Sequence, residues 1–281
     1  MLHFLHTFAP QPILAVVGPF TLHWYGLMYL VAIAIAYLLV DRLLRRLKIS
    51  GATNLLERLP TFTVGLFISS IIGARLYHVV SQWSIYYATH LDKLFALNEG
   101  GLAIHGGLIG GGLFLWWYGK KLFATKKTSS LFWLADVLTP AVLLGQAIGR
   151  WGNYFNQELF GRPTNLPWGI PIAPEYRQAA FADATYFHPA FLYESLWDLA
   201  GFFFLAWWQR RVLKQGRLGA GLVTFPYLIW MGVGRVLVEL IRIEPAPIIF
   251  GLRWHLIISL CIVLIGLLGF MTTLLQKRRV Y

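Results

Sequence analysis

A polar run interrupts the apolar sequence at residues 149–162, directly after the apolar stretch 131–148. The run contains Arg150, Asn153 and Glu158 together with further carboxamides. Such groups are unfavourable in hydrocarbon and persist mainly where they line a site or a water-filled cavity. Guanidinium groups present forked donors that bind phosphate oxygens in pairs. The run therefore indicates a site for a phosphate-bearing ligand at the end of a membrane span.

Three further arginines lie within apolar stretches and cannot be moved into loops without shortening a span: Arg75, Arg235 and Arg242. Arg235 and Glu239 are four residues apart, so a structural ion pair on one helix face and a functional role are both open. Arg242 lies near the expected membrane interface, where its stem allows it to snorkel. For Arg75, a structural pairing with a carboxylate such as Glu194 and a functional role are both open, with the functional role slightly favoured.

His105 and Tyr25 each begin another apolar stretch. A histidine can act as a general base near neutral pH, although a lone one is also typical of a satisfied helix interface. Tyr25 is by default part of an aromatic belt. The sequence has no HExxH, GxSxG or Walker motif, which disfavours hydrolase and ATPase functions. The buried carboxylates Asp136 and Asp198 are interpreted as structural.

The composition indicates a polytopic membrane protein. Of 281 residues, 57% are hydrophobic and 13% charged, against about 25% charged residues in soluble domains. The apolar residues form runs of about 20 residues, the length that spans a bilayer core. We predict an all-α bundle in one transmembrane domain over residues 1–281. Its seven expected spans are 20–40, 62–81, 102–119, 131–150, 188–208, 219–241 and 255–275.

Most of the 24 basic residues fall in connectors on one side of this seven-span arrangement. The positive-inside rule makes that side cytoplasmic, with the N-terminus outside and the C-terminus in the cytoplasm. The longer connectors, 82–101 and 151–187, then face outward as loop or head segments. The net charge of +12 is explained by topology and by attraction to anionic lipid, so no nucleic-acid partner is expected. Polar groups from six spans gather at one depth in the outer half of the membrane.

The residues also resemble a known family over nearly the whole chain. The matching blocks are residues 22–29, 105–110, 149–162 and 188–194, and Gly234-Arg235 with Glu239 and Arg242. Together they resemble the bacterial prolipoprotein diacylglyceryl transferases. The resemblance implies transfer of the diacylglyceryl group of phosphatidylglycerol to the lipobox cysteine of a prolipoprotein signal peptide. The products are a thioether and glycerol phosphate, with no metal or cofactor, at a multi-pass protein of the bacterial inner membrane.

The resemblance also implies roles for individual residues. Arg150 and Arg235 would hold the lipid phosphate and stabilise charge as it leaves. His105 would assist removal of the thiol proton, or position the substrate. Asn153 would position the headgroup, and Gly161 would allow a tight turn beside the ligand. The other positions tied to activity or expected to support the arginines are Tyr25, Glu158, Glu194, Glu239 and Arg75.

One position departs from the family pattern. Some members have a tyrosine four residues before the arginine of the sixth span, where this chain has Met231. Tyr227 is then the candidate for any hydroxyl role. Three other functions stay open: an anion or lipid transporter, a non-catalytic scaffold that binds anionic lipid, and a different phospholipid-using transferase.

Overall fold

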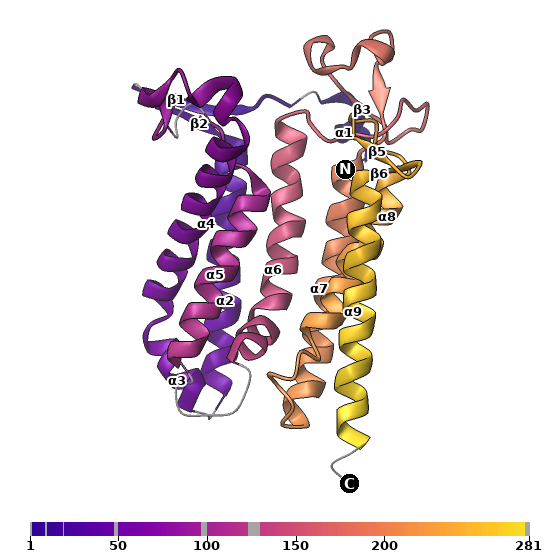
Figure 1. The fold of residues 1–281 in the computed structure, drawn as a ribbon. Coiled ribbons are helices and arrows are strands. Elements are labelled where there is room, and N and C mark those ends of the chain that lie inside the picture. Colours follow the sequence, from indigo (N-terminus) through magenta and orange to yellow (C-terminus); the bar gives the residue numbers. More distant parts are fainter. Residues whose placement is uncertain are drawn as a thin grey trace. The chain divides into compact units, whose positions relative to one another are not determined.

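The computed structural model describes residues 2–8, 10–18, 20–47, 50–96, 100–122 and 130–278. Most of them are helical (Figure 1). The chain divides into two compact units, one formed by Met1–Leu39 with Ala135–Tyr281 and the other by Val40–Leu134. Helices α2 (Trp24–Arg46) and α6 (Ser130–Phe155) pass from one unit to the other.

The Val40–Leu134 unit is built on two packed helices, α4 (Leu59–Ser81) and α5 (Ile104–Leu122). Their backbones approach closely because glycines face the neighbouring helix: a Cβ on Gly106 would clash with the carbonyl group of Gly73. This is the close packing that small residues permit between membrane helices. The unit also contains α3 (Ser50–Glu57), η1 (Trp83–Tyr87) and η2 (Leu91–Lys93).

The larger unit contains the short helix α1 (Leu2–Thr7) and three long helices, α7 (Ala190–Lys214), α8 (Thr224–Glu239) and α9 (Trp254–Arg278). Trp197 and Trp230 hold α7 and α8 against each other. Their rings stack with centroids 4.7 Å apart. Each indole N–H also donates to the carbonyl oxygen of the other residue, at 3.0 and 3.1 Å.

Asp136 fixes the start of α8. Its carboxylate is fully buried and accepts hydrogen bonds from the backbone N–H groups of Gly219, Gly221, Val223 and Thr224, at 2.9–3.0 Å. The first N–H groups of a helix have no partner within the helix, so a carboxylate there satisfies them and complements the helix dipole. The structural interpretation of Asp136 is confirmed.

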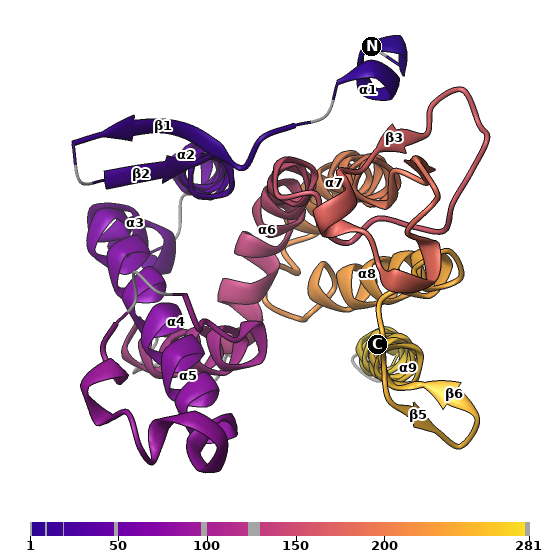
Figure 2. The ribbon, with the colours of Figure 1, turned by 90° about the horizontal axis from the view of Figure 1, so that it is seen from above.

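Short strands and loops surround the helix ends of the larger unit, as Figure 2 shows from above. The antiparallel pairs are β1 (Ile13–Val17) with β2 (Phe20–His23), β3 (Ile170–Pro171) with β4 (Tyr186–Phe187), and β5 (Ile248–Ile249) with β6 (Leu252–Arg253). The 3-10 helices η4 (Pro174–Tyr176) and η5 (Ala179–Phe181) lie between β3 and β4.

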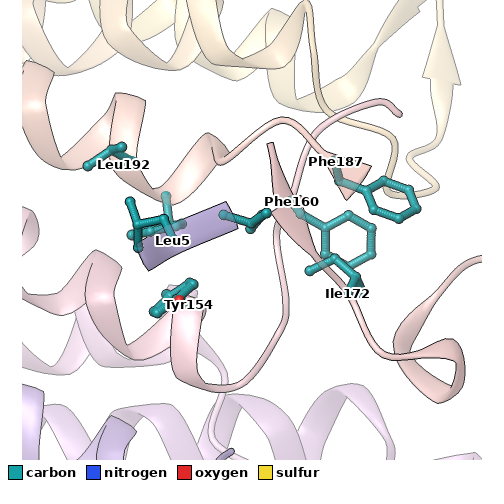
Figure 3. Close-up of a cluster of buried hydrophobic side chains, with 8 residues drawn as sticks. Leu5, Tyr154, Phe160, Ile172, Phe187 and Leu192 are labelled. Atoms are coloured by element: carbon teal, nitrogen blue, oxygen red, sulfur yellow. The ribbon is translucent and has the colours of Figure 1, made fainter. Parts of the chain in front are cut away.

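The head segment 156–189 has a hydrophobic core that joins it to the helices. Its buried members are Leu5, Tyr154, Phe160, Ile170, Ile172, Phe187, Phe191 and Leu192. Figure 3 shows Leu5 of α1 beside Tyr154, from the end of α6, and Leu192, from the start of α7. Burial of these side chains holds the head segment over the ends of α6 and α7.

Four helices are long and apolar enough to cross a membrane, among the residues that the structure describes: Trp24–Arg46, Leu59–Ser81, Leu131–Phe155 and Trp254–Leu275. The remaining predicted spans also coincide with helices, α5, α7 and α8. Helix α8 has only 16 residues, fewer than the roughly 20 needed to span the bilayer core. The structure is that of a helical membrane protein, and the seven-span topology stays a prediction.

Candidate functional site

Three helices of the larger unit bring predicted site residues together. Arg150 lies in the last turns of α6, Arg235 lies one turn before the end of α8, and Glu194 lies in the first turns of α7. The stacked pair of Trp197 and Trp230 fixes α7 against α8 next to these positions. The helix ends therefore hold the charged groups on rigid elements.

The carboxylate of Glu194 is the centre of the arginine cluster, which we define as Arg150, Arg235 and Arg242. Glu194 is 6% exposed. Its Oε2 lies 2.5 Å from Nε of Arg150, and its Oε1 lies 3.1 Å from Nη1 of Arg235 and 3.7 Å from Nη1 of Arg242. The contact with Arg150 is an ion pair without the geometry of a directed hydrogen bond. A buried carboxylate is costly unless it is paired, so these ion pairs persist. They hold the three guanidinium groups in place around Glu194.

Arg150 and Arg235 keep donors available for a ligand. Within the described part of the chain, the terminal nitrogens of Arg150 and the Nε and Nη2 atoms of Arg235 make no hydrogen bond. These side chains are 24% and 26% exposed. Three guanidinium groups around one carboxylate leave an excess of positive charge. The cluster is therefore suited to bind a phosphate or another oxyanion.

Of the two possibilities left open for Arg235 and Glu239, the ion pair on one helix face does not form. Glu239 instead lies with its Oε1 3.1 Å from Nε of Arg253 and 3.7 Å from Nδ1 of His255. Arg235 instead donates from Nη1 to Oε1 of the buried Glu194 on α7, at 3.1 Å. Sequence reasoning missed Arg253, which looked like an ordinary basic residue of an outer connector.

Arg242 does not snorkel. It is 7% exposed, and its Nε donates to Oε2 of Glu244 at 2.9 Å. Arg253 donates from Nη1 to the carbonyl oxygen of Arg242 at 2.9 Å and from Nη2 to that of Glu244. The segment after α8 is thus held by two arginines, and Arg242 is a fixed member of the cluster.

Asn153 is positioned by the last turn of α6. The helix continues to Phe155, into the segment predicted as a loop, so Asn153 is helical and buried. Its Nδ2 donates to Oε1 of Glu158 at 2.8 Å. Glu158 therefore orients an asparagine, and the prediction that it orients an arginine is wrong.

Tyr25 lies beside the same turn of α6. A Cβ on Gly152 would be 2.7 Å from Cδ2 of Tyr25, so the tyrosine ring packs directly on the α6 backbone. The hydroxyl group of Tyr25 lies 3.0 Å from that of Tyr29, one turn along α2. Tyr25 thus belongs to the part of the larger unit that contains Asn153.

Gly161 does not form the predicted tight turn. The left-handed residues nearby are Gln157 and Leu159, with φ of 51° and 56°. Gly161 pairs with Arg242 in an isolated β-bridge, and its N–H donates to the carbonyl oxygen of His188 at 2.9 Å. A Cβ at Gly161 would lie 2.8 Å from Cβ of His188. Glycine is needed here because three backbone segments meet beside Arg242.

His188 links the head segment to α7. Its Nδ1 lies 3.2 Å from the hydroxyl oxygen of Tyr193, which accepts a hydrogen bond from Nε1 of Trp168 at 2.9 Å. Because the Tyr193 oxygen already accepts from the indole, its proton is available to the imidazole nitrogen. Burial lowers the pKa of His188, which favours the neutral imidazole ring.

Arg75 in the Val40–Leu134 unit is held by backbone carbonyl groups of its own unit. It donates from Nε to Leu94 at 2.9 Å, from Nη1 to Gly100 at 2.7 Å and from Nη2 to Lys93 at 2.5 Å. All three nitrogens are used in this way. Arg75 therefore orders the described parts of the connector between α4 and α5.

His105 lies in the first turn of α5 and is exposed. Its ring centroid is 5.9 Å from that of Tyr77 on α4. Arg75 lies near this end of the same helix pair, because the N–H of Ala103 donates to the carbonyl oxygen of Ala74 at 3.1 Å. The expectation that His105 and Arg75 lie at one level of their helices agrees with this arrangement.

Two further observations concern the predicted chemistry. The hydroxyl group of Tyr227 accepts a hydrogen bond from Nε2 of Gln146 at 3.2 Å, and its use in place of the tyrosine missing at Met231 stays a prediction. Among the described residues, no three His, Cys, Asp or Glu side chains are grouped so that they could hold a metal ion.

Comparison with known proteins identifies the family. The family model described as prolipoprotein diacylglyceryl transferase matches residues 12–272. The chain belongs to the prolipoprotein diacylglyceryl transferase family. The resemblance found in the sequence is therefore confirmed, and the arginine cluster is a feature of a member of this transferase family.

Curated relatives in the transferase family match most of this chain. A protein of Trichormus variabilis is 40% identical over 278 residues, which cover 99% of this chain and 94% of the relative. A protein of Synechococcus elongatus is 39% identical over 262 residues, or 93% and 86% of the two chains. One from Synechocystis is 39% identical over 271 residues, or 96% and 92%. All three are named phosphatidylglycerol–prolipoprotein diacylglyceryl transferase.

Proposed function

We propose that this protein transfers the diacylglyceryl group of phosphatidylglycerol to the lipobox cysteine of a prolipoprotein, the first step of lipoprotein maturation. The names of the relatives supply both substrates. The observation that carries the proposal is the pair of guanidinium groups, Arg150 and Arg235, that one buried carboxylate holds with donors open to a ligand. This is the arrangement that a phosphate leaving group requires.

The reaction is a displacement at the glyceryl carbon that bears the phosphate. The cysteine thiol loses its proton, and the thiolate sulfur attacks this carbon. A carbon–sulfur bond forms as the carbon–oxygen bond breaks, and the electron pair of the broken bond leaves with glycerol phosphate. The second negative charge develops on the phosphate, where Arg150 and Arg235 stabilise it. His105 is the proposed acceptor of the thiol proton, since the thiolate is the nucleophile.

The neighbouring side chains take supporting roles in this proposal. Asn153, oriented by Glu158, binds the glycerol or phosphate oxygens of the headgroup, and Tyr25 packs the turn that presents it. Gly161 lets the backbone close beside Arg242. No cofactor is required, because the lipid supplies its own leaving group.

The proposal includes a membrane topology. Seven spans place the N-terminus outside and the C-terminus in the cytoplasm of a bacterial cell, with the site toward the outer leaflet of the inner membrane. Each predicted span coincides with a helix, and the arginine cluster lies at helix ends covered by the head segment. A site at that level meets lipid headgroups and substrates that arrive from the secretion machinery.

The test is a transfer assay with purified protein in detergent, phosphatidylglycerol and a fluorescent lipobox peptide. We expect a mass gain of one diacylglyceryl group, which is absent with a Cys→Ser peptide and falls about 10²–10³-fold in Arg150→Ala. Arg210→Ala is the matched control, because Arg210 is an exposed guanidinium at the far end of α7.

His105→Gln separates catalysis from lipid binding, whereas Asn153→Ala should lower both. A transferase loses product in both variants, and a non-catalytic scaffold never forms the thioether even in the unmodified protein. Absence of peptide modification by folded protein with several anionic lipids would refute the transferase and favour the scaffold or the transporter.

A further inference from the structure

The hairpin between α8 and α9 has an unusual residue at its turn. Strands β5 and β6 pair Ile249 with Leu252, so Phe250 and Gly251 form a two-residue turn. Both have positive φ, 52° and 75°, as in a type I′ turn. Such turns favour Asn-Gly, and a bulky residue in this conformation is strained. Turn geometry alone therefore does not explain the phenylalanine.

The residues around this turn present an apolar surface. Phe250 is 97% exposed, Ile248 73% and Leu252 43%, and Trp254 at the start of α9 is also exposed. Contiguous exposed apolar side chains mark an interaction surface. The question is which partner covers it.

The position of the hairpin at the end of a membrane span identifies that partner as lipid. Strand β6 ends at Arg253, and the candidate span Trp254–Leu275 begins at the next residue. The turn is at most about 13 Å from the span at the rise of a β-strand, and each interfacial layer of a bilayer is about 5–7 Å thick. Seen along α9, the hairpin projects sideways (Figure 2), and Figure 1 shows it beside the start of that helix.

We propose that the apex of the β5–β6 hairpin, with Phe250 at its tip, inserts into the lipid leaflet beside the arginine cluster. A sideways projection at this level places the apex over the lipid that surrounds α9. Aromatic and aliphatic side chains at the interface bury apolar area there, and Trp254 adds an interfacial aromatic ring.

The base of the hairpin connects this apex to the arginine cluster. Arg253 pairs with Glu239 at 3.1 Å and donates to the carbonyl oxygen of Arg242 at 2.9 Å. An apex held in lipid therefore fixes the height of Arg242 and its neighbours relative to the headgroups. The lipid contact is independent of the proposed function, and only its effect on transfer rests on that function.

Site-directed labelling tests the lipid contact. Cys261 is the sole cysteine, so Cys261→Ser gives a background for Phe250→Cys and, as the control, Asn165→Cys on an exposed part of the head segment. Each cysteine receives an environment-sensitive fluorophore in vesicles that contain phosphatidylglycerol. We expect position 250 to be quenched by a nitroxide on the lipid acyl chain near the headgroup, and position 165 by iodide in the water. If position 250 is quenched by iodide as position 165 is, the proposal is overturned.

A pair of substitutions tests the connection to activity. Phe250→Asn suits the turn, so thermal stability in detergent should stay equal or rise, while the transfer rate in vesicles falls severalfold. Phe250→Leu keeps an apolar apex and should retain the rate. Full activity in Phe250→Asn would overturn the connection to the cluster. Absence of transfer in every variant, including the unmodified protein, would refute the proposed function and leave the labelling result intact.

Discussion

Glu194→Gln distinguishes two possible roles of the Glu194 carboxylate: to reduce the net charge of the arginine cluster, or to position its guanidinium groups. The substitution keeps the shape of the side chain but removes the negative charge that Arg150, Arg235 and Arg242 share. If affinity for phosphate depended only on positive charge, the variant would bind phosphatidylglycerol better and react faster. If the carboxylate positions the guanidinium groups, the variant binds the lipid at least as well as the unmodified protein and still loses its rate.

The structure sets the expected magnitude. At 3.1 Å and an effective dielectric constant of about 20, one guanidinium–carboxylate attraction is about 5 kcal/mol before desolvation is subtracted. Removal of one partner from a buried pair costs about 3–5 kcal/mol of stability. Solvent screens part of this, because Arg150 and Arg235 are 24% and 26% exposed, so we expect about 3 kcal/mol. Loss of one preorganised donor lowers kcat by about 10²–10³, and we expect a fall of about 100-fold here.

The assay measures kcat and KM for phosphatidylglycerol together with thermal unfolding in detergent. Glu244→Gln is the matched control, because it removes one negative charge beside Arg242 without contact with Arg150 or Arg235. We expect the control to lose little kcat. The positioning argument fails if folded Glu194→Gln retains kcat within about threefold, or if Glu244→Gln loses as much; one preorganised donor alone is worth about 10²-fold or more.

Three other predictions concern the surroundings of the cluster. Gly161→Ala places a Cβ 2.8 Å from that of His188 and 3.1 Å from the carbonyl oxygen of Ile241; we expect a loss of about 1–3 kcal/mol, measured as a lower unfolding temperature. Asp136→Asn turns an amide group toward backbone donors that need an acceptor, so unfolding should become easier by about 3 kcal/mol. The pKa of His188 is lowered by burial, so the unfolded state binds its proton first and stability should fall as pH drops below about 6.5; an unchanged pH profile of unfolding in His188→Gln would contradict this.

The sequence predicts the helices of this protein because their signal is local. Apolar runs of about 20 residues, interrupted by basic connectors, locate each end of the long helices to within about six residues. Two members of the arginine cluster can also be predicted from local sequence. Arg150 and Arg235 lie in apolar runs, where hydrocarbon disfavours charge, so they indicate a site. Both inferences need only the chemistry of neighbouring residues.

The partners of these charges could not be predicted in the same way. The i, i+4 spacing suggested Arg235 with Glu239, but the buried carboxylate of another helix, Glu194, lies closer to the guanidinium. Arg75 donates to backbone carbonyl groups. Every residue has such a group, so the residue types in the sequence do not indicate which ones an arginine will bind. Arg253 was overlooked because its importance depends on a hairpin that returns the chain to the end of α8.

The buried Glu194 explains how the cluster can favour reaction over binding. A phosphodiester carries one negative charge, and the glycerol phosphate that leaves gains a second as the carbon–oxygen bond breaks. Interactions that are equally strong with substrate and transition state do not raise kcat. Because the carboxylate offsets part of the charge of Arg150, Arg235 and Arg242, it weakens the hold on the singly charged lipid while it keeps their donors fixed. The donors are then in place for the second charge, so the stabilisation appears where the bond breaks.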